Sequence, residues 1–113
     1  MRIGVTSQNF RTITGHAGKA RRFLIFQTEG AGGPRETGRL DLPKEMSLHE
    51  YHGPDHPVYA FDVVITAGCG AGFAQRLASR GVTVVTTSEP DPLTAVAAVA
   101  AERPLPPAAP HAH

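Results

Sequence analysis

The glycine-rich segment at residues 67–73 is the part of the sequence best suited to bind a ligand. It reads Ala-Gly-Cys-Gly-Ala-Gly-Phe, between a stretch typical of a buried strand and one typical of a helix. Glycines at such a junction let backbone N–H groups approach an anion at the helix N-terminus. Gly68, Gly70 and Gly72 are therefore candidate binding residues. The alternative is a simple tight turn, and the G-x-G-x-G spacing departs from the G-x-G-x-x-G of dinucleotide-binding loops.

Cys69, the only cysteine of the chain, lies within this loop. A thiol near a helix N-terminus has a lowered pKa and more of the thiolate form, which binds metals. The alternative interpretation is a small buried hydrophobic residue. A single cysteine excludes an internal disulfide and a C-x-x-C zinc site, and it is typical of a reduced, cytoplasmic protein.

A second candidate is His16, which glycines flank on both sides. An imidazole in such a loop could ligate a metal cluster, and nearby cations would balance the negative charge of that cluster. The cations that follow in the sequence are Lys19, Arg21 and Arg22. The alternative is an ordinary surface loop with a solvated basic turn.

Three further histidines, His49, His52 and His56, are candidate metal ligands. The spacing of the first two places both imidazoles on one face of a helical turn, which is a workable metal pair. Two more, His111 and His113, stand at the end of the sequence. A histidine-rich metal-binding protein is thus one hypothesis, and solvated loop histidines are the alternative.

Length, charge and composition exclude several classes of protein. The 113 residues allow one domain, and a net charge of +1 argues against a nucleic-acid binder. No apolar run approaches the ~18 residues of a membrane span, and no long apolar signal segment is present. The ten acidic residues are scattered and not paired on strands, so two-metal phosphoryl chemistry is not expected. We expect a soluble protein that is not an enzyme.

The elements that must position these residues follow from hydrophobic periodicity and turn signals. Strands are expected at residues 2–7, 12–14, 22–27, 37–42, 62–67 and 82–86. Helices are expected at residues 73–80, which Gly81 stops, and after Asp91, which caps a helix with proline at its first position. One or two helical turns are expected to begin at Ser47.

These elements predict an α/β fold, with a mixed sheet of about five strands and flanking helices. The N-terminal strands pair antiparallel, and the C-terminal strands form a parallel β-α-β unit with Val63, Ile65, Phe73 and Val84 buried. Ligands bind where the carboxyl ends of parallel strands gather, so His16 and Cys69 are expected to share that edge of the sheet.

The domain is expected to span residues 1–102. Residues 103–113 form a Pro/His-rich tail with four prolines, and we expect this tail to be extended and mobile. Residues beyond about Pro104 should then add little to stability.

Several segments in this order resemble one known family. MRIGVTS at residues 1–7, TGHAGKARRFLIF at 14–26, DVVIT at 62–66, QRLA at 75–78 and GVTVV at 81–85 are similar to the dinitrogenase iron-molybdenum cofactor biosynthesis family. That family includes NifX-type carriers and the C-terminal domain of NifB-type proteins. The resemblance covers about residues 1–101, and Ala17 stands where the family usually has Phe.

The resemblance implies a ribonuclease-H-like fold of about five strands and a role in nitrogen fixation. It implies a non-enzymatic carrier of an iron-sulfur or molybdenum-iron-sulfur cluster, or of a precursor, that exchanges this cargo with donor and acceptor proteins. The family histidine corresponds to His16. We expect His16 and Cys69 as ligands in a monomer or weak homodimer that binds neither nucleic acid nor membrane. An oxyanion- or nucleotide-binding regulatory module that uses the glycine loop is the alternative.

Overall fold

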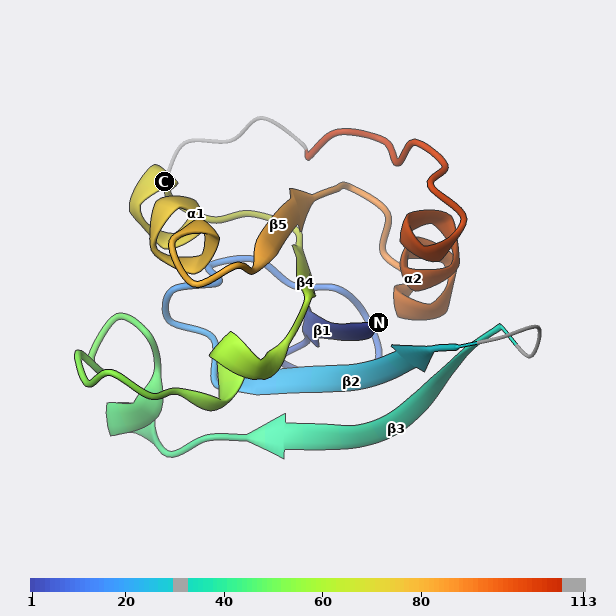
Figure 1. Ribbon diagram of the computed structural model, residues 1–113. Coiled ribbons are helices and arrows are strands. Elements are labelled where there is room, and N and C mark those ends of the chain that lie inside the picture. Colours follow the sequence, from blue (N-terminus) through green and yellow to red (C-terminus); the bar gives the residue numbers. More distant parts are fainter. Residues whose placement is uncertain (30–32, 109–113) are drawn as a thin grey trace.

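A computed structural model describes residues 1–29 and 33–108, and five strands within these ranges form one mixed sheet (Figure 1). The strand order across the sheet is β3-β2-β1-β4-β5. The strands are β1 (Arg2–Thr6), β2 (Arg22–Thr28), β3 (Pro34–Asp41), β4 (Val63–Thr66) and β5 (Thr83–Thr86). The helices are α1 (Ala71–Ala78) and α2 (Pro92–Ala100), with two 3-10 helices, η2 (Lys44–Met46) and η3 (Pro57–Ala60). The predicted fold class, an α/β fold with one mixed five-stranded sheet and flanking helices, is confirmed.

Strand β1 is the centre of the sheet and pairs in both directions. It runs antiparallel to β2, with Val5 opposite Leu24, and parallel to β4, with Val5 beside Ile65. The outer pairs follow the same division, because β2 and β3 are antiparallel whereas β4 and β5 are parallel. The antiparallel N-terminal half and parallel C-terminal half were both predicted from the sequence.

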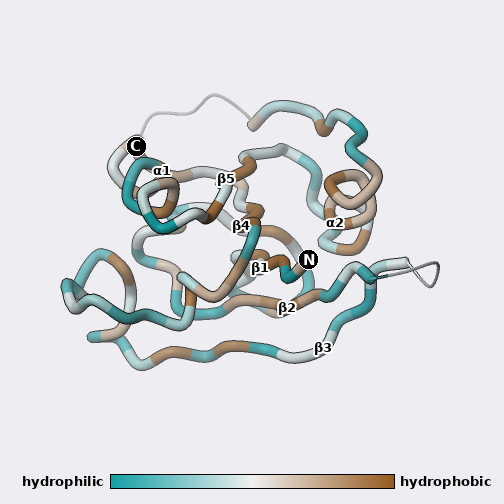
Figure 2. The backbone as a smooth tube through the Cα atoms, in the orientation of Figure 1, coloured by the Kyte–Doolittle hydropathy of each residue, from teal (hydrophilic) through white to brown (hydrophobic). Residues whose placement is uncertain are grey.

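Apolar side chains alternate between the two faces of the sheet, so each face needs its own cover. Phe23, Val64, Phe73 and Leu77 belong to one buried cluster, on the face that α1 covers. A second cluster includes residues of β1, β2 and β4 together with Val96 of α2. The helices thus lie on opposite faces (Figure 1), and hydrophobic residues concentrate in the central strands and α2 (Figure 2).

The four residues predicted to be buried lie in these two clusters or against them. Val63, Ile65 and Phe73 are buried, as expected. Val84 is only partly buried against the first cluster. Its strand, β5, stands at the edge of the sheet, where only one neighbouring strand shields it.

Local signals in the sequence explain where the helices start and stop. Asp91 caps α2, since its carboxylate accepts hydrogen bonds from Thr94 N at 2.9 Å and Thr94 Oγ1 at 2.6 Å. These hydrogen bonds hold the pKa of Asp91 below its usual value. Helix α1 starts two residues earlier than predicted, with Gly70 as its N-cap, and Gly81 follows it with a φ of 79°. That left-handed conformation is the one in which glycine commonly ends a helix.

The strand predicted at residues 12–14 is absent from the structure. Asn9 Oδ1 accepts hydrogen bonds from Arg11 N at 2.8 Å and Thr12 N at 2.9 Å, which is a turn that competes with strand pairing. Ile13 N then donates to Pro90 O, far from any β-ladder. The hydrogen bonds of the Asn9 side chain to backbone amides therefore outweigh the preference of the β-branched residues at 12–14 for a strand.

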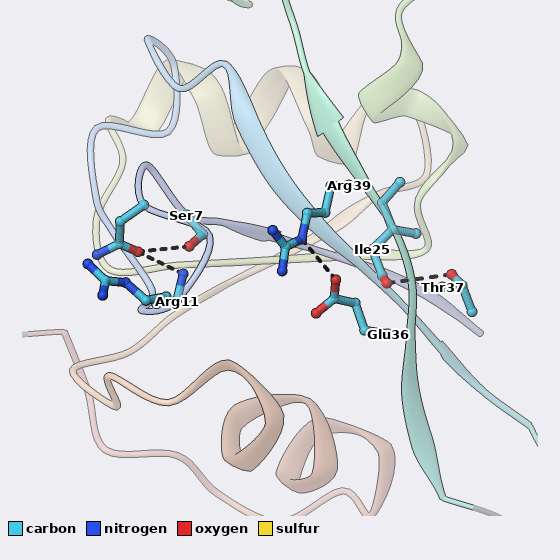
Figure 3. A network of polar contacts seen from close by, with 7 residues as sticks. Ser7, Arg11, Ile25, Glu36, Thr37 and Arg39 are labelled. Carbon is cyan, nitrogen blue, oxygen red and sulfur yellow. Dashed lines mark hydrogen bonds and ion pairs between the residues drawn. The ribbon is translucent and has the colours of Figure 1, made fainter.

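Strand β3 lies at the opposite edge of the sheet and carries charged side chains there. Arg39 Nε lies 3.1 Å from Glu36 Oε2, and this pair is drawn in Figure 3. Charged side chains on an edge strand discourage pairing with another chain. The edge position predicted for this segment is confirmed, although β3 begins at Pro34, three residues earlier than expected.

The segment after α2 packs against the molecule, which the sequence did not predict. Leu105 is partly buried against the second hydrophobic cluster. Pro106 O accepts hydrogen bonds from Thr87 Oγ1 at 2.6 Å and from Ser88 N at 3.3 Å. The expectation that residues beyond Pro104 add little is therefore wrong for Leu105 and Pro106, because one apolar side chain and one carbonyl suffice to attach them. Residues 109–113, with both terminal histidines, lie outside the described residues.

Removing this packed segment should destabilise the protein. A chain that ends at Pro104 loses the Leu105 contacts and leaves the buried Thr87 hydroxyl without its acceptor, so we expect a loss of about 1–3 kcal/mol. The melting temperature should then fall by several degrees. A chain that ends at Ala108 keeps both contacts and serves as the control. Equal melting temperatures for the two truncations would contradict the structure.

Candidate functional site

Two buried threonines join the loops at the carboxyl ends of β1 and β4. Thr6 Oγ1 lies 2.6 Å from Thr14 O and 2.8 Å from Thr66 Oγ1, which itself lies 3.1 Å from the same carbonyl. Ala67 N also donates to Thr14 O at 3.1 Å. Both threonines are fully buried. The loop after β1 is therefore fastened directly to the loop after β4.

Further backbone hydrogen bonds fix the segment that carries His16 between two others. Ala17 N donates to Gly68 O at 3.1 Å, next to Cys69 in the chain. On the other side, His49 N donates to Gly18 O at 2.7 Å. Three segments that are far apart in the sequence thus meet around His16. This arrangement confirms that the loops after β1 and β4 lie at one edge of the sheet.

A cavity of about 650 Å³, here called the glycine-loop pocket, lies between these segments and α1. Its polar lining residues are His16, Lys19, His49, Cys69 and Arg76, and its other lining residues include Leu48, Gly70, Gly72 and Phe73. None of the described residues that line it is Asp or Glu. The pocket therefore combines an imidazole pair and a thiol with two permanent cations, beside an apolar wall.

Most of the predicted ligand-binding residues meet in this pocket, and three do not. His16, Lys19, Cys69, Gly70 and Gly72 line the glycine-loop pocket. Arg21 lines a neighbouring groove instead. Gly68 supports the loop from behind: its carbonyl accepts from Ala17 N, and its own N lies 3.4 Å from Thr66 Oγ1.

Arg22 does not lie with the other cations. Its guanidinium forms an ion pair with Asp41 at 3.5 Å, donates to Gln8 O at 3.0 Å and lies 5.2 Å from the centre of the Phe10 ring. The expectation that Arg22 balances charge beside His16 is therefore wrong. The β-strand alternation that begins at this residue turns it away from Arg21.

Burial raises the pKa of the Cys69 thiol. The sequence predicted the opposite direction, from the position of this residue near a helix N-terminus. The thiol is partly desolvated in the loop, and desolvation disfavours the charged thiolate. Without a ligand, Cys69 is therefore held as the neutral thiol.

His16 adopts an unusual backbone conformation, with a φ of 53°. A side chain with a Cβ in this left-handed region costs roughly 1–2 kcal/mol relative to ordinary conformations. Such strain persists only where the surroundings impose it, and it concentrates at functional sites. Two backbone hydrogen bonds hold the loop in this shape. Ala17 N donates to Gly68 O at 3.1 Å, and Lys19 N donates to His16 O at 2.9 Å.

The predicted metal site of His49, His52 and His56 is not formed. His56 is buried, its Nε2 contacts Met46 O, and its Nδ1 accepts from Val58 N at 3.1 Å. Both nitrogens thus bind the backbone, where His56 caps the 3-10 helix η3. Within residues 1–29 and 33–108, no group of three or more His, Cys, Asp or Glu side chains could hold a metal ion. Of the three histidines, only His49 lines the glycine-loop pocket.

Sequence reasoning missed Arg76, which both lines the pocket and holds its wall. Its guanidinium donates to Tyr59 Oη at 2.8 Å, Leu48 O at 2.6 Å and Tyr51 O at 2.6 Å. All three acceptors are neutral, and no ion pair of Arg76 occurs within the described residues. The signal in the sequence was an arginine on the first two turns of a helix that follows a glycine loop, with no acidic residue in that helix.

Comparison with known proteins gives a family and a fold. Residues 1–102 match the family model for the dinitrogenase iron-molybdenum cofactor. The chain belongs to this family. No curated protein matches the chain.

Two solved structures share the fold of this family member. The crystal structure of PH0822 superposes with a TM-score of 0.69 at 19% identity, over 91% of this chain and 93% of that chain. The NMR structure of a Thermotoga protein, described as a NifB protein of the DUF35 family, gives a TM-score of 0.59 at 16% identity. That match covers 99% of this chain and 97% of the other.

Membership associates the chain with the biosynthesis or binding of the iron-molybdenum cofactor. The resemblance seen in the sequence, including the segment around His16, is thereby confirmed at the level of the family. Ala17 is buried in the first hydrophobic cluster. None of the helices in the described part of the chain is long and apolar enough to cross a membrane.

The hydrogen bonds that connect Thr6 and Thr66 with Thr14 O can be tested by removing one hydroxyl. Thr66→Val keeps the shape of the side chain but leaves Thr14 O and Thr6 Oγ1 each short of a buried partner, at a cost of about 1–3 kcal/mol. Amide exchange at Ala17 and Ala67 should also become faster, because the two loops lose their connection. Thr86→Val is the control, since Thr86 lies beside Thr66 on β5 but is exposed. Equal urea midpoints for the two variants would contradict this role.

The environment of His56 predicts a loss of stability at acidic pH. Burial lowers its pKa below the usual 6.5; the contact with Met46 O partly opposes this effect, and the nearby charge of Arg76 adds a smaller lowering. As pH falls through 6.5, the unfolded chain binds a proton on His56 before the folded chain does. The free energy of unfolding should therefore decrease below pH 6.5, and level off below the folded-state pKa.

Urea unfolding between pH 7.5 and 5.0 measures this dependence. His56→Gln should flatten it, whereas His52→Gln, at an exposed position, should leave it as in the unaltered protein. The same slope in all three proteins would show that His56 is not the titrating group.

Proposed function

We propose that this chain is a non-enzymatic carrier of an iron-sulfur or molybdenum-iron-sulfur cluster, or of a precursor, in the assembly of the iron-molybdenum cofactor. The observation that carries the proposal is the meeting of His16 and Cys69 in one pocket with two cations. Family membership supports it, because the family is that of this cofactor. In this proposal the chain works as a monomer or weak homodimer between a donor and an acceptor protein.

The donor atoms of the pocket suit a cluster better than a single ion. Imidazole nitrogen and thiolate sulfur are ligands that iron and iron-sulfur clusters accept. The described residues provide no group of three ligands that could surround one metal ion. A cluster has several metal atoms, so His16 and Cys69 can each bind a different one across the 650 Å³ cavity.

The charges of the pocket fit an anionic cargo. Clusters ligated by sulfide and thiolate carry net negative charge, and Lys19 and Arg76 line the same cavity. The charge of Arg76 is not cancelled by a carboxylate within the described residues, because its hydrogen bonds go to two carbonyls and a tyrosine hydroxyl. An unpaired, partly buried cation attracts an anion strongly, since the local dielectric is low.

The same features support one alternative, an oxyanion or nucleotide site at the start of α1. Gly70 and Gly72 line the pocket beside Lys19, and the first N–H groups of a helix favour negative charge. Gly68 contributes less to such an anion site than expected, because its N–H lies within hydrogen-bonding distance of Thr66 Oγ1. The cluster hypothesis ranks first because it alone uses His16 and Cys69 as ligands.

Anaerobic reconstitution with iron and sulfide tests the proposal. We expect His16→Asn and Cys69→Ser each to lower the iron content and the visible absorbance of the reconstituted protein several-fold. Asn tolerates the left-handed backbone at position 16, so this variant removes the imidazole without added strain. Binding should also strengthen as pH rises, because Cys69 must lose its proton when it ligates.

His52→Asn is the matched control, since it removes an exposed imidazole outside the pocket. Far-UV circular dichroism should be identical for all variants. Unaltered occupancy in both pocket variants would refute the ligand assignment. If the protein then bound inorganic phosphate or a nucleotide in the same pocket, the oxyanion alternative would replace the cluster hypothesis.

A further inference from the structure

A second cavity adjoins the glycine-loop pocket and is lined mainly by cations. It measures about 380 Å³ and is here called the basic groove; its lining residues are Lys19, Arg21, Lys44, Ser47, His49 and Glu50. Lys19 and His49 line both cavities. We infer that the basic groove docks an acidic surface of the protein that loads or empties the glycine-loop pocket.

Charge is the first argument for this docking surface. Lys19, Arg21 and Lys44 are all exposed, and none of them forms an ion pair within residues 1–29 and 33–108. Two nearby cations of the β2–β3 hairpin do form ion pairs, Arg22 with Asp41 and Arg39 with Glu36. Glu50 is the one acidic residue among the described lining residues. The groove thus presents unbalanced positive charge in a chain whose net charge is only +1.

Hydrogen bonds hold the backbone beneath these side chains, so the points from which the charged side chains extend are fixed. Leu42 N donates to Arg21 O at 2.8 Å, which ties the end of β3 to the start of β2. The bond from His49 N to Gly18 O ties the turn after η2 to the segment that carries Lys19. Ser47 is almost fully buried and lines the floor, and its hydroxyl makes no hydrogen bond within the described residues. It is available to a carboxylate of the partner.

Exposed cations on a fixed backbone suit an acidic protein surface better than a small anion or a nucleic acid. A small anion is held tightly by buried, preorganised groups, whereas here the lysines and arginine are exposed and mobile at their ends. Single-stranded nucleic acid is bound largely by aromatic side chains that stack on its bases, and no Phe, Tyr or Trp is among the described residues of the groove. Exposed charges around a binding site accelerate and orient the encounter of two proteins.

The shared residues explain why docking belongs beside the pocket. A partner seated on the basic groove contacts Lys19 and His49, which also border the space proposed for the cargo. Transfer between two proteins requires their two sites to adjoin, and this arrangement brings them together. The identity of the partner as a cargo protein rests on the proposed function, whereas the preference for an acidic surface rests on the groove alone.

Titration with a peptide of twelve glutamates tests the inference on the cargo-free protein. At about 20 mM salt we expect amide shifts at Lys19, Lys44 and His49 in NMR spectra, and at least tenfold weaker binding at about 200 mM salt. The double variant Arg21→Glu/Lys44→Glu should bind at least tenfold more weakly. The control is Arg11→Glu/Arg35→Glu, which makes the same change of charge in a cavity at the other end of the β2–β3 hairpin. It should change the affinity less than twofold.

Each other result overturns the inference. Equal losses of peptide affinity in the two double variants would show that only the net charge of the protein matters. Tighter binding of tripolyphosphate than of the peptide would show a small-anion site, and tighter binding of a twelve-nucleotide single strand would show a nucleic-acid site. The outcome is separate from that of cluster reconstitution, because the peptide titration uses protein without cargo. A protein that takes up no cluster but binds the peptide in this manner refutes the proposed function and leaves the docking surface standing.

Discussion

One buried carbonyl, that of Thr14, holds together the part of the structure on which the site depends. It lies within hydrogen-bonding distance of the hydroxyls of Thr6 and Thr66 and of the amide of Ala67. Both threonines end parallel strands at the middle of the sheet, where the rigid hydrophobic core fixes their positions. The loop with His16 can therefore be irregular and strained and still occupy one place. Its position beside Cys69 rests on these polar bonds together with the packing of Ala17 in the first hydrophobic cluster.

Arg76 completes the pocket from the other side by a similar use of backbone carbonyls. It binds Leu48 O and Tyr51 O, which belong to a segment with little regular structure between β3 and β4. His56 secures the same segment through Met46 O and Val58 N. A cation that holds a loop by neutral acceptors keeps its full charge, whereas an ion pair would cancel it. Arg76 thus both builds the wall of the pocket and makes that wall attractive to anions.

The sheet was predictable because its signals are local, and much of the site was not because its contacts are distant in sequence. Alternation of apolar residues was enough for β1, β2, β4 and β5, and Asp91 was enough for the start of α2. The meeting of His16 and Cys69 followed from strand direction alone. The role of Arg76 depends on carbonyls 25 and 28 residues away, which no motif encodes.

The errors have the same cause. His56 has the chemistry of a metal ligand, but its nitrogens are committed to backbone groups that the sequence does not reveal. Residues 12–14 are the exception, because the captured donors lie only two and three residues from Asn9 and the turn is encoded in the local sequence. Leu105 looked like part of a featureless tail because a single apolar residue has no periodicity. Function in this fold rests on such single contacts, while the periodic elements only bring them within reach.

The raised pKa of Cys69 bears on the proposed carrier role of the glycine-loop pocket. A partly buried thiolate with no metal would be an unbalanced charge, and the neutral thiol avoids it. In the proposed carrier, binding of a cluster replaces the proton of Cys69 by a metal, and release of the cluster returns the proton. The affinity measured at neutral pH is therefore lower than the intrinsic strength of the metal–sulfur bond by the free energy of removing that proton. For an enzyme with a resident cofactor this loss would be a disadvantage. For a protein that must give up its cargo, it moderates the affinity and stabilises the empty state, with no further residue required.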